Sequence, residues 1–127
     1  MSRLNIPVMK DRNVNELYPG CSPDEAFVLI APSGEASYEG EFALGEDQKT
    51  VIVFINESRS VTAKCVLKAG NGMHGVKDLS VVVMPNTVVT VTPDAGRFKI
   101  VSGEDRGKVV ISDVEGEDFK VAVFEAP

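Results

Sequence analysis

Apolar and polar residues alternate with a period of two along much of this chain, and residues 60–68 show the pattern most clearly. The apolar positions on one face of this segment are Val61, Ala63, Cys65 and Leu67. Such alternation, with β-branched residues among its members, is typical of a strand that buries one face. We therefore predict a strand here, with the thiol of Cys65 turned toward the core.

Two other segments, residues 50–55 and 79–84, are apolar on both faces. A strand of this kind suits the centre of a sheet, or a place where a neighbour covers its second face. Residues 87–92 are rich in valine and threonine, which favour strands over helices. Pro85 cannot donate to a ladder and Asn86 tolerates turn geometry. We therefore predict that the chain reverses there and that the two flanking segments form a tight pair.

Shorter strand-like segments fill the rest of the chain. They are residues 26–31, 35–44, 97–101, 108–111 and 119–124. The alternation within them places these residues inward: Phe98, Ile100, Val109, Ile111, Phe119, Val121 and Val123. We expect residues 56–59 to form a hairpin between the segments that they join, and residues 113–118 to form an acidic turn.

Turn-forming residues separate these segments at intervals of about eight to twelve residues, which is the spacing of sandwiches and barrels. No stretch has the 3.6-residue period of a helix over a useful length. We therefore predict an all-β protein. Its fold would be a single antiparallel β-sandwich over residues 24–127, immunoglobulin-like or jelly-roll-like, with an extended N-terminal arm over residues 1–23.

The predicted arm lacks the alternation of the rest of the chain, and its apolar residues are scattered among charged and amide side chains. It either packs on its own domain or docks on another subunit. In the second interpretation the candidate partner-binding residues are Leu4, Ile6, Val8, Met9, Leu17 and Tyr18.

The composition narrows the classes of function. A chain of 127 residues with 43% hydrophobic content can form one domain with its own core. The net charge of −6 argues against binding to nucleic acid or to anionic lipid, because both require a basic surface. No segment has the apolar length of a signal peptide or a membrane helix, so we expect a protein made in a cytoplasm. This setting favours free thiols at Cys21 and Cys65 over a disulfide.

Each candidate chemical motif lacks a required part. The run Gly70-x-Gly72-x-x-Gly75 has the letters of the dinucleotide fingerprint, but strand-like residues follow where a helix N-terminus is needed. His74 is the only histidine, so neither a catalytic triad nor a zinc site is indicated. The acidic residues 113–118 lack the ligand order of a calcium loop. We therefore predict a protein that is not an enzyme and that carries no cofactor or metal.

Some apolar surface remains beyond what one core requires. It comprises Phe124, Val66 and the second faces of residues 50–55 and 79–84. A two-layer sandwich needs to bury only one face of each sheet. The surplus is either covered by residues 1–23 or forms an interface, and both interpretations stay open at this point.

A resemblance adds to these patterns. The residues that carry it are 50–56, Val61-Thr62-x-Lys64, Leu67-Lys68-Ala69-Gly70-Asn71-Gly72, Asp78-Leu79-Ser80-Val81-x-Val83-x-Pro85, Gly96-Arg97-Phe98-Lys99, Gly107-Lys108-Val109-x-Ile111 and Val121-x-Val123. In this order, over residues 41–126, the chain resembles small structural proteins encoded among the capsid and tail genes of bacteriophages and prophages.

The resemblance implies a structural virion protein that binds the outside of a phage capsid as a decoration or cementing protein. Its partners would be the major capsid protein or other virion subunits, together with further copies of the chain, and its location would be the virion. One alternative is a carbohydrate- or surface-binding module of a tail fibre or cell-surface protein, favoured by an exposed aromatic platform near Tyr38 or Phe42. The other is a small enzyme, favoured by a deep cleft that holds two acids.

Overall fold

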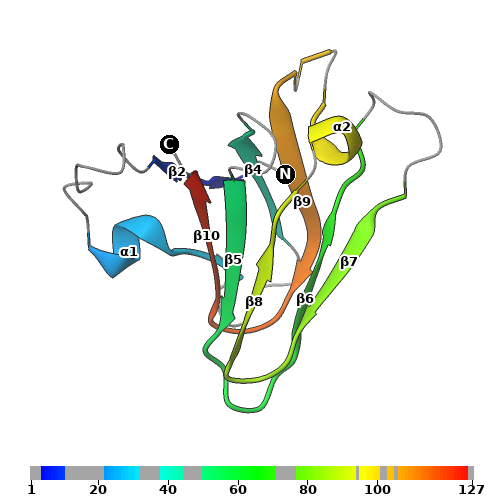
Figure 1. Cartoon of the computed structure of the whole chain (residues 1–127). Helices are drawn as coiled ribbons and strands as arrows, with labels where there is room; N and C mark the ends of the chain where they lie inside the picture. The colour runs from blue at the N-terminus through cyan, green and yellow to red at the C-terminus, as the bar shows by residue number, and fades with distance from the viewer. Residues whose placement is uncertain are drawn as a thin grey trace.

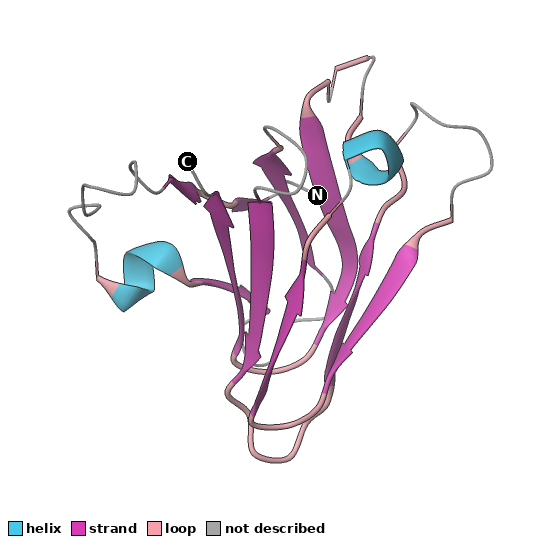
Figure 2. Ribbon diagram, viewed as in Figure 1, coloured by secondary structure: helices cyan, strands magenta, loops and turns pink. Residues whose placement is uncertain are grey.

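The computed structural model describes residues 4–10, 22–31, 38–44, 50–70, 77–93, 95–100, 103–104 and 106–125. Strands dominate these residues, and the helices in them are two four-residue turns (Figures 1 and 2). The strands are β1 (Leu4–Asn5), β2 (Val8–Lys10), β3 (Val28–Ala31), β4 (Tyr38–Ala43), β5 (Thr50–Asn56), β6 (Ala63–Leu67), β7 (Leu79–Val83), β8 (Thr87–Val91), β9 (Lys108–Glu115) and β10 (Phe119–Glu125). The helices are α1 (Pro23–Ala26) and α2 (Ala95–Phe98). The predicted all-β class is therefore confirmed.

The strands form two sheets and not a closed barrel. Sheet I has the order β1-β4-β9-β6-β7, and sheet II has the order β2-β10-β5-β8, with β3 also paired to β10. All pairs are antiparallel except β1 with β4 and β2 with β10, which are parallel. The prediction of wholly antiparallel sheets is thus wrong at these two edges, where the N-terminal residues run in the same direction as their neighbours.

The core lies between the two sheets and takes side chains from both. Its largest members include Phe42 of sheet I and the pair Phe54 and Phe119 of sheet II, all fully buried. The rings of Phe54 and Phe119 stack with centroids 5.8 Å apart. Each such ring stabilises the fold by roughly 1.5–3 kcal/mol through burial of its apolar surface. The residues that confirm the predicted alternation by their burial are Ala63, Cys65, Leu67, Val109, Ile111, Phe119, Val121 and Val123, whereas Val61 and Ile100, also predicted inward, are only half-buried.

Residues 4–10 pass from the edge of one sheet to the edge of the other. Leu4 pairs with Gly40 in sheet I, while Val8 pairs with Val123 in sheet II. Ile6 lies between these contacts and is only 1% exposed. A Cβ atom at Gly40 would lie 2.9 Å from Cδ1 of Ile6 and 3.0 Å from Cδ1 of Ile30. The absence of a side chain at Gly40 therefore makes room for Ile6 at this side of the core.

Two predicted hairpins are wrong, because each of these connections crosses between the sheets. The β5–β6 connection leads from sheet II to sheet I, and the β7–β8 connection leads back (Figure 1, lower end). Asn86 does adopt the predicted turn geometry, with φ of 56°. However, β7 pairs with β6 and β8 pairs with β5, so the two flanking strands become edge strands of different sheets. The prediction that residues 79–84 form a central or covered strand is therefore also wrong.

Two further segments differ from prediction. Residues 95–98 form α2 in place of the predicted strand, and Phe98 is nonetheless buried, because a helical turn can also direct one side chain inward. Strand β9 continues through Asp113 to Glu115, where an acidic turn was predicted. Asp113 has φ of 52°, and the β6–β9 register shifts beside it, which marks a bulge. Aspartate tolerates this left-handed conformation, so the strand resumes after one irregular residue.

Candidate interaction surfaces

The outer faces of the two sheets differ in chemistry. On sheet I, oppositely charged side chains lie across neighbouring strands as ion pairs. These pairs are Lys64–Glu115 at 3.1 Å, Lys68–Asp78 at 3.1 Å and Lys108–Glu41 at 2.5 Å. Most of these side chains are substantially exposed, so the pairs contribute little to stability and keep the face hydrated. Across β4, β9 and β6 this face has the character of ordinary solvent-exposed surface, whereas on β7 the apolar side chain of Val82 is 55% exposed.

The outer face of sheet II is largely apolar. Cross-strand registers place Val53 beside Ala122, Val51 beside Phe124 and Ile55 beside Val88 on this face. We call the whole set the apolar face, and it comprises Met9, Phe27, Leu29, Val51, Val53, Ile55, Val88, Ala122 and Phe124. Leu29 and Val88, near its two margins, are 42% and 57% exposed. Contiguous apolar surface of this kind marks an interaction site more often than isolated exposed residues do.

The protein covers part of the apolar face itself. The ring of Phe27, directly after α1, meets the ring of Phe124 edge to face with centroids 5.9 Å apart. Beside this contact is an open hollow of about 320 Å³ that Pro23, Phe27, Ile55, Glu57 and Lys120 line. Lys120 and Glu57 form an ion pair at 2.7 Å, which places paired charge at the rim of the hollow. Some of the predicted surplus apolar surface is therefore covered, while Leu29 and Val88 stay accessible.

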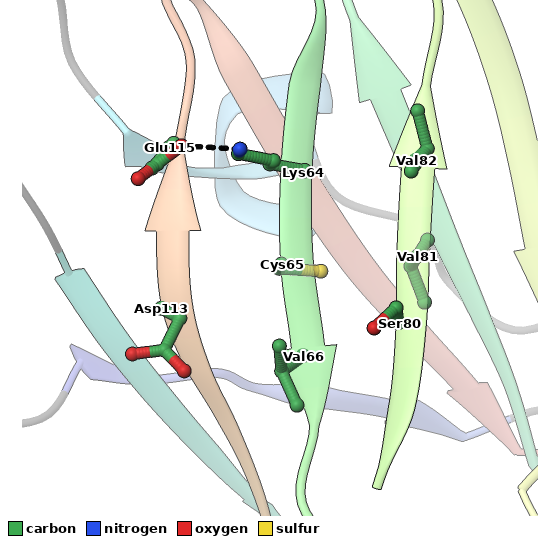
Figure 3. A pocket seen from close by; sticks show the side chains of 8 residues that line it. All are labelled: Lys64, Cys65, Val66, Ser80, Val81, Val82, Asp113 and Glu115. Atoms are coloured by element: carbon green, nitrogen blue, oxygen red, sulfur yellow. Dashed lines mark ion pairs between the residues drawn. The ribbon is translucent and has the colours of Figure 1, made fainter.

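A second hollow, of about 380 Å³, lies on sheet I across β9, β6 and β7 (Figure 3). Figure 3 shows Asp113 and Glu115 on one side and Val82 on the other, with Lys64 reaching Glu115. The outward-facing charged residues around it are exposed, so this is an open trough and not the deep acid-lined cleft that would favour an enzyme. Cys65 belongs to the buried row beneath it, and burial raises the pKa of its thiol to about 12. The thiol is therefore protonated at neutral pH and is a poor nucleophile.

The turns that carry the resemblance meet at one end of the molecule. The amide of Gly70 donates a hydrogen bond to the carbonyl of Arg97 over 2.7 Å. Nearby, the amide of Gly107 donates to the carbonyl of Ile100 over 2.6 Å, and the amide of Ile100 donates to the carbonyl of Lys108. These contacts bring Gly70, at the end of the segment after β6, together with residues 97–100 and 107–108 in one backbone cluster beside α2. The residues of these turns therefore have a structural role in holding the cluster together.

Asp78 fixes the two ends of the β6–β7 connection. Its carboxylate accepts a hydrogen bond from the amide of Ala69 over 2.7 Å and lies 3.1 Å from the ammonium of Lys68. The bond from Ala69 lowers the pKa of Asp78, and Lys68 lowers it further. The folded state therefore favours the ionised carboxylate more than the unfolded state does.

This linkage predicts a pH effect. The stabilisation is fully present above the ordinary aspartate pKa of about 3.9 and is lost as the pH falls through the lower pKa of the folded state. Because the side chain of Asp78 is 40% exposed, solvent screening limits the effect to less than about 1 kcal/mol. We expect Asp78→Asn to flatten the acid limb of a plot of unfolding free energy against pH, measured by urea denaturation. Lys68→Ala should keep part of that limb, because it leaves the hydrogen bond from Ala69, the largest single contribution, in place.

The structure places the predicted partner-binding residues unevenly. Ile6 is buried, and Leu4 and Val8 pack against the core, so these side chains are engaged by the protein's own sheets. Met9 lies on the apolar face beside Phe124. Leu17 and Tyr18 lie outside the described residues, as do Cys21 and His74. The predicted contact of Leu17 and Tyr18 with a partner stays a prediction. A partner that contacts residues 4–10 would meet Met9 more readily than the buried Ile6.

Sequence reasoning found only part of the apolar face. The two-sided apolar pattern of residues 50–55 pointed to it, and β5 is indeed central in sheet II. The contributions of Phe27 and Leu29 were missed, because their segment is short and apolar throughout. Only the pairing of β3 with β10 shows that Leu29 faces outward beside Lys120.

Comparison with known proteins finds no matching family model, no matching curated protein and no matching solved structure. Among the residues that the structure describes, no group of three or more His, Cys, Asp or Glu side chains is placed to hold a metal ion. Within the same residues, no helix is long and apolar enough to span a membrane.

Proposed function

We propose that this protein is a structural virion protein that binds the outside of a phage capsid as a decoration or cementing protein. In this proposal the two sheets form an immunoglobulin-like or jelly-roll-like sandwich, and residues 1–23 include an arm that contributes Leu17 and Tyr18 to the contact. The apolar face of sheet II is the observation that supports the proposal most directly. A shell-binding protein needs a stable domain with one surface suited to burial.

The distribution of charge also supports attachment through sheet II, with sheet I facing solvent. The charged, ion-paired face of sheet I is suited to solvent, whereas on the apolar face Lys120 is already paired with Glu57. The centres of protein interfaces are depleted in charged residues, and polar side chains form their rims. The chain as a whole has a charge of −6. We therefore propose a shell surface with an apolar centre and basic residues around it, which would attract an acidic protein.

The attachment is best tested by point substitution. A deletion of residues 2–23 would remove β1, β2 and the buried side chain of Ile6 together, so a loss of binding could reflect unfolding. Leu29 and Val88 are exposed, and they lie outward on different strands of sheet II. A lysine at either position can keep its ammonium in water in the isolated protein but would have to be desolvated in an apolar interface.

We expect the double variant Leu29→Lys/Val88→Lys to bind shells at least about tenfold more weakly than the wild type, since a tenfold loss needs only about 1.4 kcal/mol. The measurement is co-sedimentation with empty shells assembled from the major capsid protein of the same genome. Thr62→Lys is the control, because it adds a lysine at an exposed position before β6 of sheet I. Thermal unfolding of each variant checks that the fold persists. Wild-type binding by the folded double variant would refute attachment through the apolar face.

The alternative, a carbohydrate- or surface-binding module, receives less support from the described residues. Such a module was expected to present an aromatic platform near Tyr38 or Phe42. The ring of Phe42 is fully buried in the core, so it cannot stack on a sugar, and the side chain of Tyr38 lies outside the described residues. The capsid proposal is therefore preferred.

A further inference from the structure

Strand β7 forms an open edge of sheet I. It pairs with β6 on one side, and no described strand pairs with its other side. Proteins usually guard such edges with charged residues, proline, bulges or very short strands, since a free edge presents unpaired backbone groups to other chains. The opposite edge strand, β1, has only two residues. In contrast, β7 has five residues of sequence LSVVV, without charge, proline or glycine.

Apolar side chains flank this edge. Val82 is 55% exposed, Met84 is 59% exposed and Leu79 is 39% exposed. The acidic residue directly before the strand, Asp78, is paired with Lys68. The edge is therefore an uncharged margin on a chain whose charge is −6. Two copies that repel each other over much of their surfaces can approach at this margin without facing like charges.

We infer that the β7 edge pairs with the β7 edge of a second copy of this chain, in antiparallel orientation about a two-fold axis at Val81. In this register Ser80 of one copy lies opposite Val82 of the other, and Leu79 lies opposite Val83. Asp78 lies opposite Met84, so no two carboxylates meet. The arrangement is isologous, because each copy contributes the same strand, and it joins the two copies of sheet I into one continuous sheet.

The size of the contact sets its strength. A pairing of two five-residue strands is much smaller than the interfaces of about 1,200 Å² or more that hold stable complexes together. We therefore expect a dimer that dissociates on dilution, with a Kd on the order of 0.1–1 mM. Such a contact would become significant where many copies are held close together, because a high local concentration favours weak pairing.

The first test is the mass of the isolated chain, measured by sedimentation equilibrium from about 10 µM to about 3 mM, a range that brackets the expected Kd. We expect the wild type to shift from monomer to dimer across this range. Val82→Lys should stay monomeric, because a lysine guards an edge strand. Val88→Lys is the matched control, because Val88 is a similarly exposed valine on the edge strand of sheet II, and it should dimerise like the wild type. A monomeric wild type at the highest concentration, or loss of the dimer only in Val88→Lys, would overturn the inference.

The second test checks the register. In a Cys21→Ser background, the variant Ser80→Cys/Val82→Cys should form a covalent dimer on mild oxidation. In the proposed register the new thiol at position 80 of one copy lies opposite the new thiol at position 82 of the other. Ser80→Cys alone should cross-link at least about fivefold less, because strand geometry separates the α-carbons at position 80 of the two copies by roughly 8 Å, beyond the span of a disulfide. Equal cross-linking by the single and double variants would refute the proposed register. It would leave self-association to be judged by the mass measurement.

Discussion

Gly70→Ala is expected to lower the free energy of unfolding by about 3–4 kcal/mol, a large fraction of the 5–15 kcal/mol typical of a small domain. A Cβ atom at this position would lie 2.2 Å from the carbonyl oxygen of Lys99 and 2.7 Å from its carbonyl carbon. Both are backbone atoms, so no side-chain rotation can relieve the overlap. Either the turn after α2 must move, or the 2.7 Å hydrogen bond from Gly70 to Arg97 must break.

Urea denaturation followed by circular dichroism measures this loss, and Gly103→Ala provides the control. A Cβ at Gly103 would meet nothing within 4 Å, but its φ of +94° is unfavourable for alanine. We expect that variant to lose only about 1–2 kcal/mol, the usual penalty for a side chain in a left-handed conformation. The pair thus separates steric overlap from backbone strain. Similar losses in the two variants would show that the close approach at Gly70 does not limit stability.

Much of the core could be predicted from alternation. The burial of Ala63, Cys65 and Leu67 was predicted correctly because period-two patterning is local. The sheet that each strand joins could not be predicted. A short connection of similar composition can either close a hairpin or cross from one sheet to the other. Nothing in residues 56–59 indicates that the chain changes sheets. That change is visible only in the strand pairing, β5 with β8 and β6 with β7.

The apolar face and the β7 edge also show that a local pattern does not reveal where a strand lies in the fold. The sequence predicted surplus apolar surface at Phe124 and along two strands, and the structure assigns that surface to two different places. The ring of Phe124 is covered by Phe27, a long-range contact that no local pattern encodes. Val82 is exposed because its side chain lies on the outer face of sheet I, on the strand that ends the sheet. Surplus apolar residues therefore indicate that an interface exists more reliably than where it lies.

Asn56 is a buried polar residue where the chain leaves sheet II, and it is 1% exposed. Its side-chain amide donates hydrogen bonds to the carbonyls of Val61 and Val83, over 2.8 Å and 3.0 Å. Its Oδ1 accepts a hydrogen bond from the amide of Ser58 over 3.0 Å. One side chain thus connects β5, the β5–β6 connection and β7, and it explains how two crossing connections are held side by side.

Asn56→Ala is expected to lower the free energy of unfolding by about 3 kcal/mol, because it leaves the backbone groups of Ser58, Val61 and Val83 without these partners in a buried site. Asn56→Asp should be similarly destabilised at neutral pH, since a carboxylate cannot donate to two carbonyl oxygens and burial disfavours its charge. That burial raises the pKa of the new carboxyl in the folded state, so Asn56→Asp should regain stability as the pH falls. Urea denaturation at pH 7 and pH 4.5 measures both effects.

Thr50→Val is the matched control for Asn56, at the opposite end of the same strand. Thr50 is 1% exposed, and its hydroxyl has no hydrogen-bond partner within the described structure. Removing an unpaired buried hydroxyl should leave stability unchanged or raise it by about 1 kcal/mol, because the desolvation penalty disappears while the shape is kept. The contrast tests whether bonding, and not mere burial of a polar group, makes Asn56 stabilising. Equal losses in Asn56→Ala and Thr50→Val would mean that the bonds of Asn56 contribute nothing beyond packing.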